Sequence, residues 1–228
     1  MTDVATVRNN AEWCEAVCRT HGRGGVFTRW AWTSRRRTPA LYPDAVTLLP
    51  ATGVADVLKA IDLSEGCSVK DSFARLDLSA DGFEPIIEAQ WIDRPAALSM
   101  PPAPSPFWTV ASVGELAEWA IAWNGGPADL FRAQLLDEPA VRVLAARRNG
   151  VIIAGAIAYD SGPVTGVSNL FAVDGDLDDA WAGVLCALPG RRVVGYGTGG
   201  ALAAAVRVGF ARAGPLRVWQ RTPSASRP

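Results

Sequence analysis

The chain has 228 residues, of which 49% are hydrophobic, and its 22 basic and 23 acidic residues give a formal net charge of −1. A chain of this length and apolar content can bury a hydrophobic core, so global disorder is excluded. The first 100 residues carry 11 basic and 13 acidic groups, and the remainder carry 11 and 10. Because neither half is a basic module, we expect no nucleic-acid partner.

The length corresponds to roughly 1.5 domains at about 150 residues per domain. We find no apolar run typical of a transmembrane helix, so no membrane association is expected, and no apolar segment of a secretory signal near the start. The four cysteines are too sparse for a disulfide framework. We therefore expect a cytoplasmic protein with reduced thiols.

A proline-rich, uncharged segment at 96–105 is predicted to be a linker, since prolines at this density lack hydrogen-bond donors and favour extended backbone. We accordingly predict an N-terminal segment at 1–95 and a domain at 106–222. The last residues, 223–228, are predicted to form a disordered tail.

In the N-terminal segment, hydrophobic periodicity and cap residues predict seven elements in chain order. They are a helix over 11–21 capped by Asn10, strands over 26–32 and 45–49, a helix over 54–63, a strand over 68–73, a helix over 74–80 and a strand over 83–92.

In the C-terminal domain the same signals predict the order β-α-α-β-β-β-α-β-α-β, with Asn149-Gly150 as a hairpin turn. The elements are a strand over 107–111, helices over 113–124 and 127–136, strands over 141–146, 151–159 and 164–173, a helix over 177–188, a strand over 192–196, a helix over 201–208 and a strand over 215–220.

Two stretches of the chain resemble each other, 46–91 and 167–219. Each is predicted to contain the order β-α-β-α-β, and each has a Gly-Phe pair before a last strand that contains a tryptophan. The spacing favours an internal repeat, and chance similarity in a chain rich in glycine and alanine is the alternative.

The predicted order from residue 107 to 220 resembles the GNAT acyltransferase superfamily, which has a helix pair after its first strand, a three-strand meander and then α-β-α-β. The Gly209-Phe210 pair before the last strand is similar to the end of many members. Through the repeat, the first half resembles the C-terminal part of the same fold. The resemblance implies an α/β (α+β) fold with a mixed sheet flanked by helices, preceded by a truncated repeat whose sheet shares a cleft with it.

The resemblance also implies an acyl-CoA donor, such as acetyl-CoA, held by a basic glycine-rich loop at a helix start. Here the matching stretch, 173–181, has one glycine, four aspartates and no basic residue, which disfavours a pyrophosphate. The equivalent stretch of the first repeat contains Thr52 and Gly53 but no adjacent basic residue. The sequence thus predicts an atypical or lost CoA loop.

Residues of the strand over 164–173 are the predicted contacts of the acyl donor, because the resemblance implies that this strand splays from its neighbour and that its backbone binds the pantetheine arm. They are Ser168, Asn169, Phe171 and Val173. For the polar pair the alternative is an ordinary hydrogen bond in the core.

A dense polar cluster contains Lys70, Asp71 and Ser72. We predict Asp71 as a catalytic carboxylate, with Lys70 and Ser72 as substrate-binding residues. A capped turn without catalytic function is the alternative.

The family often uses a tyrosine in the helix after the strand that matches 192–196 to protonate the leaving thiolate, and the resemblance makes Tyr196, which lies slightly earlier, the candidate proton donor. Glu88 is a second candidate base, with Trp91 lining the substrate. The alternatives are a plain strand end at Tyr196, followed by a glycine-rich turn, and a solvated edge strand at Glu88.

Cys14, Cys18 and His21 share a helix face, but no fourth metal ligand is evident, so no metal is predicted. His21 and Trp13 are predicted substrate-binding residues instead. The stretch Arg35–Arg37 is either a solvated loop or a grip for phosphate.

These features predict an acyltransferase that acts on an amine of a small molecule, as a monomer or a homodimer. Two alternatives remain open. One is a non-catalytic binding module of the same fold, and the other is an enzyme of different chemistry, such as a decarboxylase, cyclase or lyase.

Overall fold

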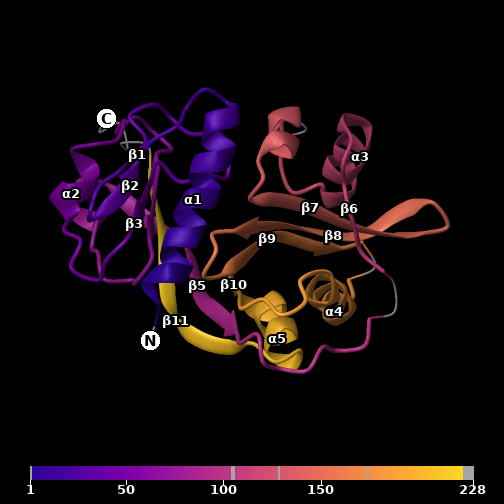
Figure 1. Cartoon of the computed structure of the whole chain (residues 1–228). Coiled ribbons are helices and arrows are strands. Elements are labelled where there is room, and N and C mark those ends of the chain that lie inside the picture. Colours follow the sequence, from indigo (N-terminus) through magenta and orange to yellow (C-terminus); the bar gives the residue numbers. More distant parts are fainter. Residues whose placement is uncertain (1, 104–105, 128, 174, 223–228) are drawn as a thin grey trace. The chain divides into compact units, whose positions relative to one another are not determined.

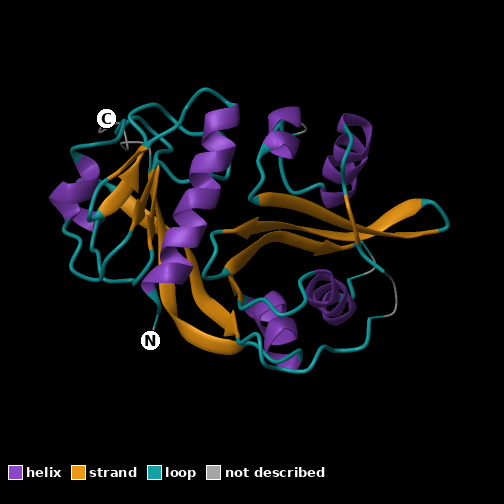
Figure 2. Ribbon diagram, in the orientation of Figure 1, coloured by secondary structure: helices purple, strands orange, loops and turns teal. Residues whose placement is uncertain are grey.

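The computed structural model describes residues 2–103, 106–127, 129–173 and 175–222 (Figure 1). The predicted tail 223–228, two residues of the predicted linker and Asp174 lie outside the described residues. The helices are α1 (Val4–Thr20), α2 (Val54–Leu58), α3 (Val113–Trp123), α4 (Leu177–Ala187) and α5 (Gly199–Arg207), with short 3₁₀ helices at Ser79–Asp81 and Ala133–Asp137 (Figure 2). The strands are β1 (Val26–Phe27), β2 (Ala31–Thr33), β3 (Ala45–Thr47), β4 (Ser68–Asp71), β5 (Phe83–Arg94), β6 (Trp108–Thr109), β7 (Val141–Arg148), β8 (Val151–Asp160), β9 (Thr165–Ala172), β10 (Val193–Gly197) and β11 (Ala211–Arg221).

The described residues form two compact units, unit 1 (residues 2–89 and 214–222) and unit 2 (residues 90–213). These bounds differ from the segments expected on either side of the linker, because the chain after Gly214 groups with the N-terminal residues. The long strands β5 and β11 each contribute residues to both units. Residues 96–103 of the expected linker contain neither helix nor strand.

Unit 1 contains a mixed sheet with the strand order β1-β2-β3-β4-β11-β5. The pair β3 and β4 is parallel, and β11 runs antiparallel to β4. Val69 of β4 packs in a core with Val57 of α2, whereas the next residue, Lys70, donates to Asn10 of α1. Because successive strand side chains point to opposite faces, the two helices cover opposite faces of this sheet.

Unit 2 contains a mixed sheet with the strand order β5-β10-β9-β8-β7-β6. Helices α4 and α5 cover one face, where Trp181 and Phe210 lie in the main core, and α3 lies on the other (Figure 1). Trp119 of α3 donates from Nε1 to the Leu144 carbonyl at 2.9 Å. A Cβ atom at Gly155 would lie 2.4 Å from that same Nε1, so only glycine permits this approach.

The strands of unit 2 confirm the meander predicted from sequence. Asn149 and Gly150 both have positive φ, 51° and 83°, which is the backbone of the tight hairpin turn that this dipeptide favours. The mixed sheet flanked by helices confirms the predicted fold class.

Four predicted helices differ from those observed. Helix α1 starts seven residues earlier than predicted, capped by Asp3, because Asn10 is buried and accepts a hydrogen bond from Lys70. Helix α2 ends at Leu58, well short of the predicted end. The α-helix predicted over 74–80 is wrong, because this stretch is a loop in which Ala74 has a φ of 51° and which ends in a 3₁₀ turn. The helix predicted over 127–136 includes one residue outside the described ones, and its described residues contain a 3₁₀ turn and no α-helix.

Candidate functional site

The two central strands of unit 2, β9 and β10, part soon after they meet. Thr165 pairs with Val193 and Gly166 pairs with Val194 in parallel register. Within the described residues 167–172 and 195–197 no further pair joins these strands. The gap between the two strands therefore begins at Val167 and Gly195. A Cβ atom added at Gly195 would lie 3.0 Å from the carbonyl oxygen of Val167.

A bulge interrupts β9 next to this gap. Asn169 has a φ of 55°, and the register with β8 shifts between Gly155 and Ile157. The Oδ1 atom of Asn169 is buried and has no hydrogen-bond partner among the described residues. A buried acceptor without a donor is costly, which marks the bulge as a place where a ligand donor would be favourable.

The other predicted donor contacts on β9 lie in different surroundings. Ser168 is half-buried. The ring of Phe171 meets Trp119 edge-on, with centroids 5.3 Å apart, on the face covered by α3. Val173 is exposed and lines a separate apolar pocket that includes Ile121 and Val151. The structure therefore does not gather these side chains in one pocket.

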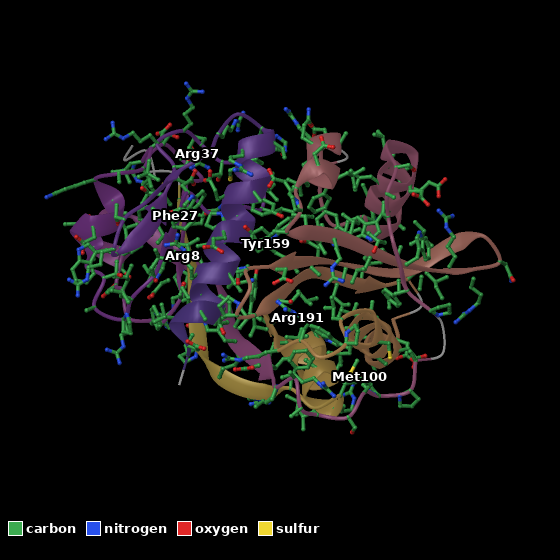
Figure 3. All side chains as sticks on the ribbon, in the orientation of Figure 1. Arg8, Phe27, Arg37, Met100, Tyr159 and Arg191 are labelled. Carbon is green, nitrogen blue, oxygen red and sulfur yellow. The ribbon has the colours of Figure 1, made fainter. Side chains whose placement is uncertain are left out.

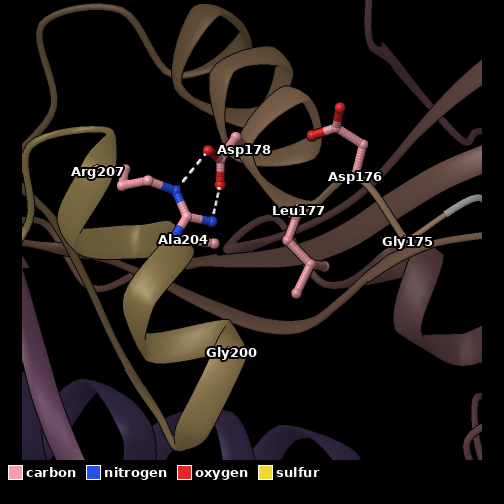
Figure 4. A pocket seen from close by; sticks show the side chains of 7 residues that line it. All are labelled: Gly175, Asp176, Leu177, Asp178, Gly200, Ala204 and Arg207. Atoms are coloured by element: carbon pink, nitrogen blue, oxygen red, sulfur yellow. Dashed lines mark hydrogen bonds and ion pairs between the residues drawn. The ribbon is translucent and has the colours of Figure 1, made fainter.

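An open pocket of about 480 Å³ lies between the start of α4 and the length of α5 (Figure 4). Its lining residues are Gly175, Asp176, Leu177, Asp178, Gly200, Ala204 and Arg207. Asp176 caps α4 by accepting the Asp179 N–H at 3.0 Å. Asp178 accepts from Nε and Nη2 of Arg207 at 2.6 and 2.7 Å, which lowers the pKa of its carboxyl. The start of α4 and the Arg207 guanidinium, which could each attract an anion, thus already contact carboxylates.

Tyr196 and Trp91 are brought together, as adjacent strands would allow. They are paired in the antiparallel register of β10 and β5, and their rings meet edge-on with centroids 5.6 Å apart. Trp91 is buried, whereas Tyr196 is 37% exposed. Within unit 2, Tyr196 follows the point where β10 leaves β9.

The predicted polar cluster of unit 1 is buried at the end of β4. Lys70 is 4% exposed and donates from Nζ to Oδ1 of Asn10 at 2.9 Å. The backbone N–H of Ser72 donates to Oγ1 of Thr47 at 2.8 Å. The cluster therefore joins β4 to α1 and to β3.

Asp71 holds the loop that follows β4. Its carboxylate accepts the N–H of Leu76 at 2.7 Å and that of Phe73 at 3.2 Å. Burial raises the pKa of the Asp71 carboxyl, and these N–H donors oppose that rise. This capping matches the structural alternative, and the catalytic assignment stays a prediction.

Glu88 is largely exposed on β5 and forms an ion pair with Arg217 of β11 at 2.7 Å. Its surroundings are those of the solvated strand face weighed as the alternative, and its role as a base stays a prediction.

The predicted residues of α1 lie along its length. The ring of Trp13 meets Tyr42 edge-on at 6.1 Å, and His21 is the C-cap residue. Burial raises the pKa of the Cys14 and Cys18 thiols. Among the described residues, no group of three or more His, Cys, Asp or Glu side chains is placed to hold a metal ion.

The loop that bears the arginine run is anchored by a buried carboxylate. Arg37, labelled in Figure 3, has its Nη1 atom 3.1 Å from Oδ2 of the fully buried Asp44. Its Nη2 atom donates to the Gly66 carbonyl. Asp44 lies in the same loop as Arg37. The sequence does not predict Asn10 and Arg207 as partners, because their contacts join residues 60 and 29 positions apart in the chain. No local signal in the sequence identifies them.

No helix in the described part of the chain has the length and apolar character needed to cross a membrane.

No family model and no curated protein matches this sequence. Several solved structures are similar to the chain. A GCN5-related N-acetyltransferase from Kribbella flavida is 20% identical, covers 97% of each chain and superposes with a TM-score of 0.63. A putative GNAT-family acetyltransferase from Novosphingobium aromaticivorans is 12% identical, with 92% of this chain and 96% of that chain covered and a TM-score of 0.56. A GNAT-family acetyltransferase from Colwellia psychrerythraea is 12% identical, with 86% and 83% covered and a TM-score of 0.50. The chain therefore has the fold of the GNAT acetyltransferases, as the element order predicted.

Proposed function

We propose that this protein is a GNAT-type acyltransferase that transfers an acyl group to an amine of a small molecule. The single observation that carries the proposal is the parting of β9 and β10 after Gly166 and Val194. The parted edge of β9 offers backbone groups to an extended ligand, in the way that an added strand pairs with a sheet edge. An acyl donor lying there would meet backbone N–H groups that polarise its carbonyl.

Tyr196 is the proposed proton donor to the leaving thiolate. It lies on β10 beyond the last pair with β9, is partly exposed and is steadied by the buried ring of Trp91. For the base that deprotonates the amine, Asp71 and Glu88 remain the proposed candidates. Asp71 would act with a raised pKa, but its oxygens already hold a loop, and Glu88 is paired with Arg217.

In this proposal, the pyrophosphate of a CoA ester fits poorly at the start of α4, which matches the CoA loop of the family. Asp176 and Asp178 occupy the helix start and the Arg207 guanidinium in the pocket of Figure 4. We therefore infer that a donor, whether CoA or another thioester, is held mainly through its acyl arm. In this proposal the acyl arm contacts the backbone of β9, the Ser168 side chain and the Asn169 amide oxygen, which has no hydrogen-bond partner among the described residues.

A second candidate is a binding module of the same fold without catalysis. The same two carboxylates favour it, because an enzyme that depends on CoA gains by leaving a helix start free for phosphate. The two candidates differ in whether acyl-donor binding leads to turnover.

The test adds a methyl group to the gap. Gly195→Ala places a Cβ atom 3.0 Å from the Val167 carbonyl oxygen, at the start of the gap. We therefore expect acetyl-CoA binding, measured by calorimetry, to weaken by about tenfold, or about 1.4 kcal/mol. Gly114→Ala is the matched control, because a Cβ there meets open space on α3. Turnover of a panel of amines by the wild type, and its loss in Tyr196→Phe with donor binding intact, would establish the enzyme.

Absence of any stabilisation by millimolar acetyl-CoA would contradict the CoA-dependent form of the proposal, since a ligand of the native state must stabilise it. Saturable binding without turnover of any amine would favour the non-catalytic module. Equal effects of both glycine variants would remove the gap as the donor site.

A further inference from the structure

The positive charge of unit 1 is concentrated in one stretch. Residues 16–43 contain six arginines and no aspartate or glutamate, in a chain whose net charge is −1. Balanced chains usually intersperse charges of both signs, since like charges close together repel. This stretch therefore differs from the rest of the molecule.

Hydrogen bonds fix the loop after α1 against the loop after β2. Nη1 of Arg23 donates to the Arg37 carbonyl at 2.9 Å, and Nη1 of Arg36 donates to the Gly22 carbonyl at 3.4 Å. The hydroxyl of Ser34, fully buried, bridges the carbonyls of Arg23 and Arg36 at 3.1 and 2.8 Å. Arg23, Arg35 and Arg36 are exposed residues of these two joined loops, and the guanidinium groups of Arg23 and Arg36 each donate to the other loop.

These three guanidinium groups have no carboxylate partner among the described residues. The neighbouring Arg37 differs, because Asp44 lies 3.1 Å away and neutralises it. The joined loops therefore carry three exposed positive charges that no carboxylate of the described chain neutralises. A bound anion would neutralise them.

We propose that Arg23, Arg35 and Arg36 form a binding site for the polyphosphate group of a small molecule. This inference goes beyond the proposed acyl transfer and does not depend on it. Each guanidinium presents a planar fork of donors that matches phosphate oxygens, and a chain of two or three phosphates has the charge to match three arginines. Since the loops are already held together, less ordering is needed on binding.

The ligand is small in this proposal because the basic surface is small. A nucleic acid would need positive charge along an extended path, and the remainder of the chain does not supply it. Inorganic pyrophosphate and triphosphate carry the chemistry that the site reads, and a nucleotide or CoA would present the same group on an organic carrier.

The experiment measures binding of inorganic triphosphate and pyrophosphate to the full chain by calorimetry at low salt, with ADP and acetyl-CoA as further arms. We expect saturable binding that weakens as salt rises and weakens by about tenfold or more in the double variant Arg35→Gln/Arg36→Gln. The matched control, Arg29→Gln/Arg212→Gln, removes the same charge from exposed arginines outside the cluster and should bind as the wild type does. Arg35→Gln alone breaks no described hydrogen bond, so it should weaken binding while leaving thermal unfolding unchanged.

Stronger binding of ADP or acetyl-CoA than of the inorganic anions would identify the carrier and support the site. The proposal is overturned if no anion binds saturably at millimolar concentration, or if the two double variants weaken binding equally, since the effect would then be one of net charge alone. Turnover of amines is not measured here, so failure of this site and failure of the acyl-transfer proposal are distinguishable.

Discussion

Unit 1 and unit 2 contain the same local arrangement stabilised in different ways. In each unit, a helix joins two parallel strands, and a long strand lies antiparallel beside the second of them in the sheet. The three strands are β3, β4 and β11 in unit 1, and β9, β10 and β5 in unit 2. In each, that third strand is not the next one along the chain but the last strand of the other predicted repeat copy. This likeness supports the proposed tandem repeat, which stays a prediction until the two stretches are superposed.

The two units differ at the element after the second parallel strand. In unit 2 that element is helix α5, which packs in the core through Leu202 and Ala205. In unit 1 the matching stretch is a loop held by the Asp71 carboxylate. The loop of unit 1 also packs through Leu76 and Leu78, but it adds a buried carboxylate that α5 does not have, so unit 1 should be more sensitive to the loss of this one polar group.

The largest expected effect comes from Asp71→Ala. This change removes the acceptor of two backbone N–H groups in a buried loop, and we expect the free energy of unfolding to fall by about 3 kcal/mol. Urea denaturation measures it. Asp77→Ala is the control, because Asp77 lies on the same loop but is exposed and accepts its hydrogen bonds from the neighbouring Ser79. A loss no greater than that of the control would show that the carboxylate does not hold the loop.

A smaller loss is expected from Asn10→Ala. Asn10 is 8% exposed, and its amide oxygen accepts from the buried Lys70 ammonium, so its removal should cost about 1–2 kcal/mol. Unfolding in urea is again the measurement, and Asn10→Asp, which keeps an acceptor, should lose less than Asn10→Ala. If the two variants unfold alike, the contact with Lys70 contributes little to stability.

The Asp71 carboxyl also predicts a dependence of stability on pH. Burial raises its pKa in the folded state above the ordinary value of 3.8, so the folded protein holds this proton more tightly than the unfolded chain. The stability that Asp71 gains from its proton is therefore complete below 3.8 and is lost as pH rises through the raised pKa. Measured against Asp71→Asn, which does not titrate, the unfolding free energy of the wild type should fall over this window. A difference that is constant with pH would contradict the raised pKa.

The sequence predicted unit 2 better than unit 1, for a physical reason. The strands β7, β8 and β9 are joined by tight turns, and local signals such as Asn149-Gly150 suffice to place them. Asn10 was taken as a helix cap because its residue type favours caps, yet a lysine 60 positions away determines its role. Residue types alone predict a helix over 74–80, because this stretch has no strong helix breaker. In the structure Ala74 has a left-handed backbone, and the N–H groups of Phe73 and Leu76 on either side of it bind the Asp71 carboxylate.

The candidate site follows the same division. The parting of β9 from β10 was expected only through the family resemblance. The two strands are joined by a helix, and the register between such strands cannot be predicted from the residues of either strand. The acidic character of the α4 start was legible directly, since it needs only the residue types of one loop. Its pairing with Arg207, 29 residues later, was not.

The smallest expected effect, Asp178→Asn, sharpens the comparison at the helices that follow the first parallel strands. In unit 1, Gly53 is the N-cap residue of α2, and its N–H donates to the Asp56 carboxylate. In unit 2, the Asp176 carboxylate caps the start of α4 and the Asp178 carboxylate pairs with Arg207. The Asp178 and Arg207 side chains are 40% and 59% exposed, so their ion pair should add little to stability, and unfolding should not change measurably.

If the Asp178 carboxylate excludes phosphate, its neutralisation frees the Arg207 guanidinium, and acetyl-CoA should bind about two- to fivefold more tightly by calorimetry. Asp179→Asn removes one charge from the same turn but leaves the ion pair intact, so it isolates the freeing of Arg207 from the change in net charge. Equal gains in both variants would mean that the pocket responds to overall charge. No gain in either would mean that phosphate does not reach this helix, and that any acyl donor is held by the strands alone.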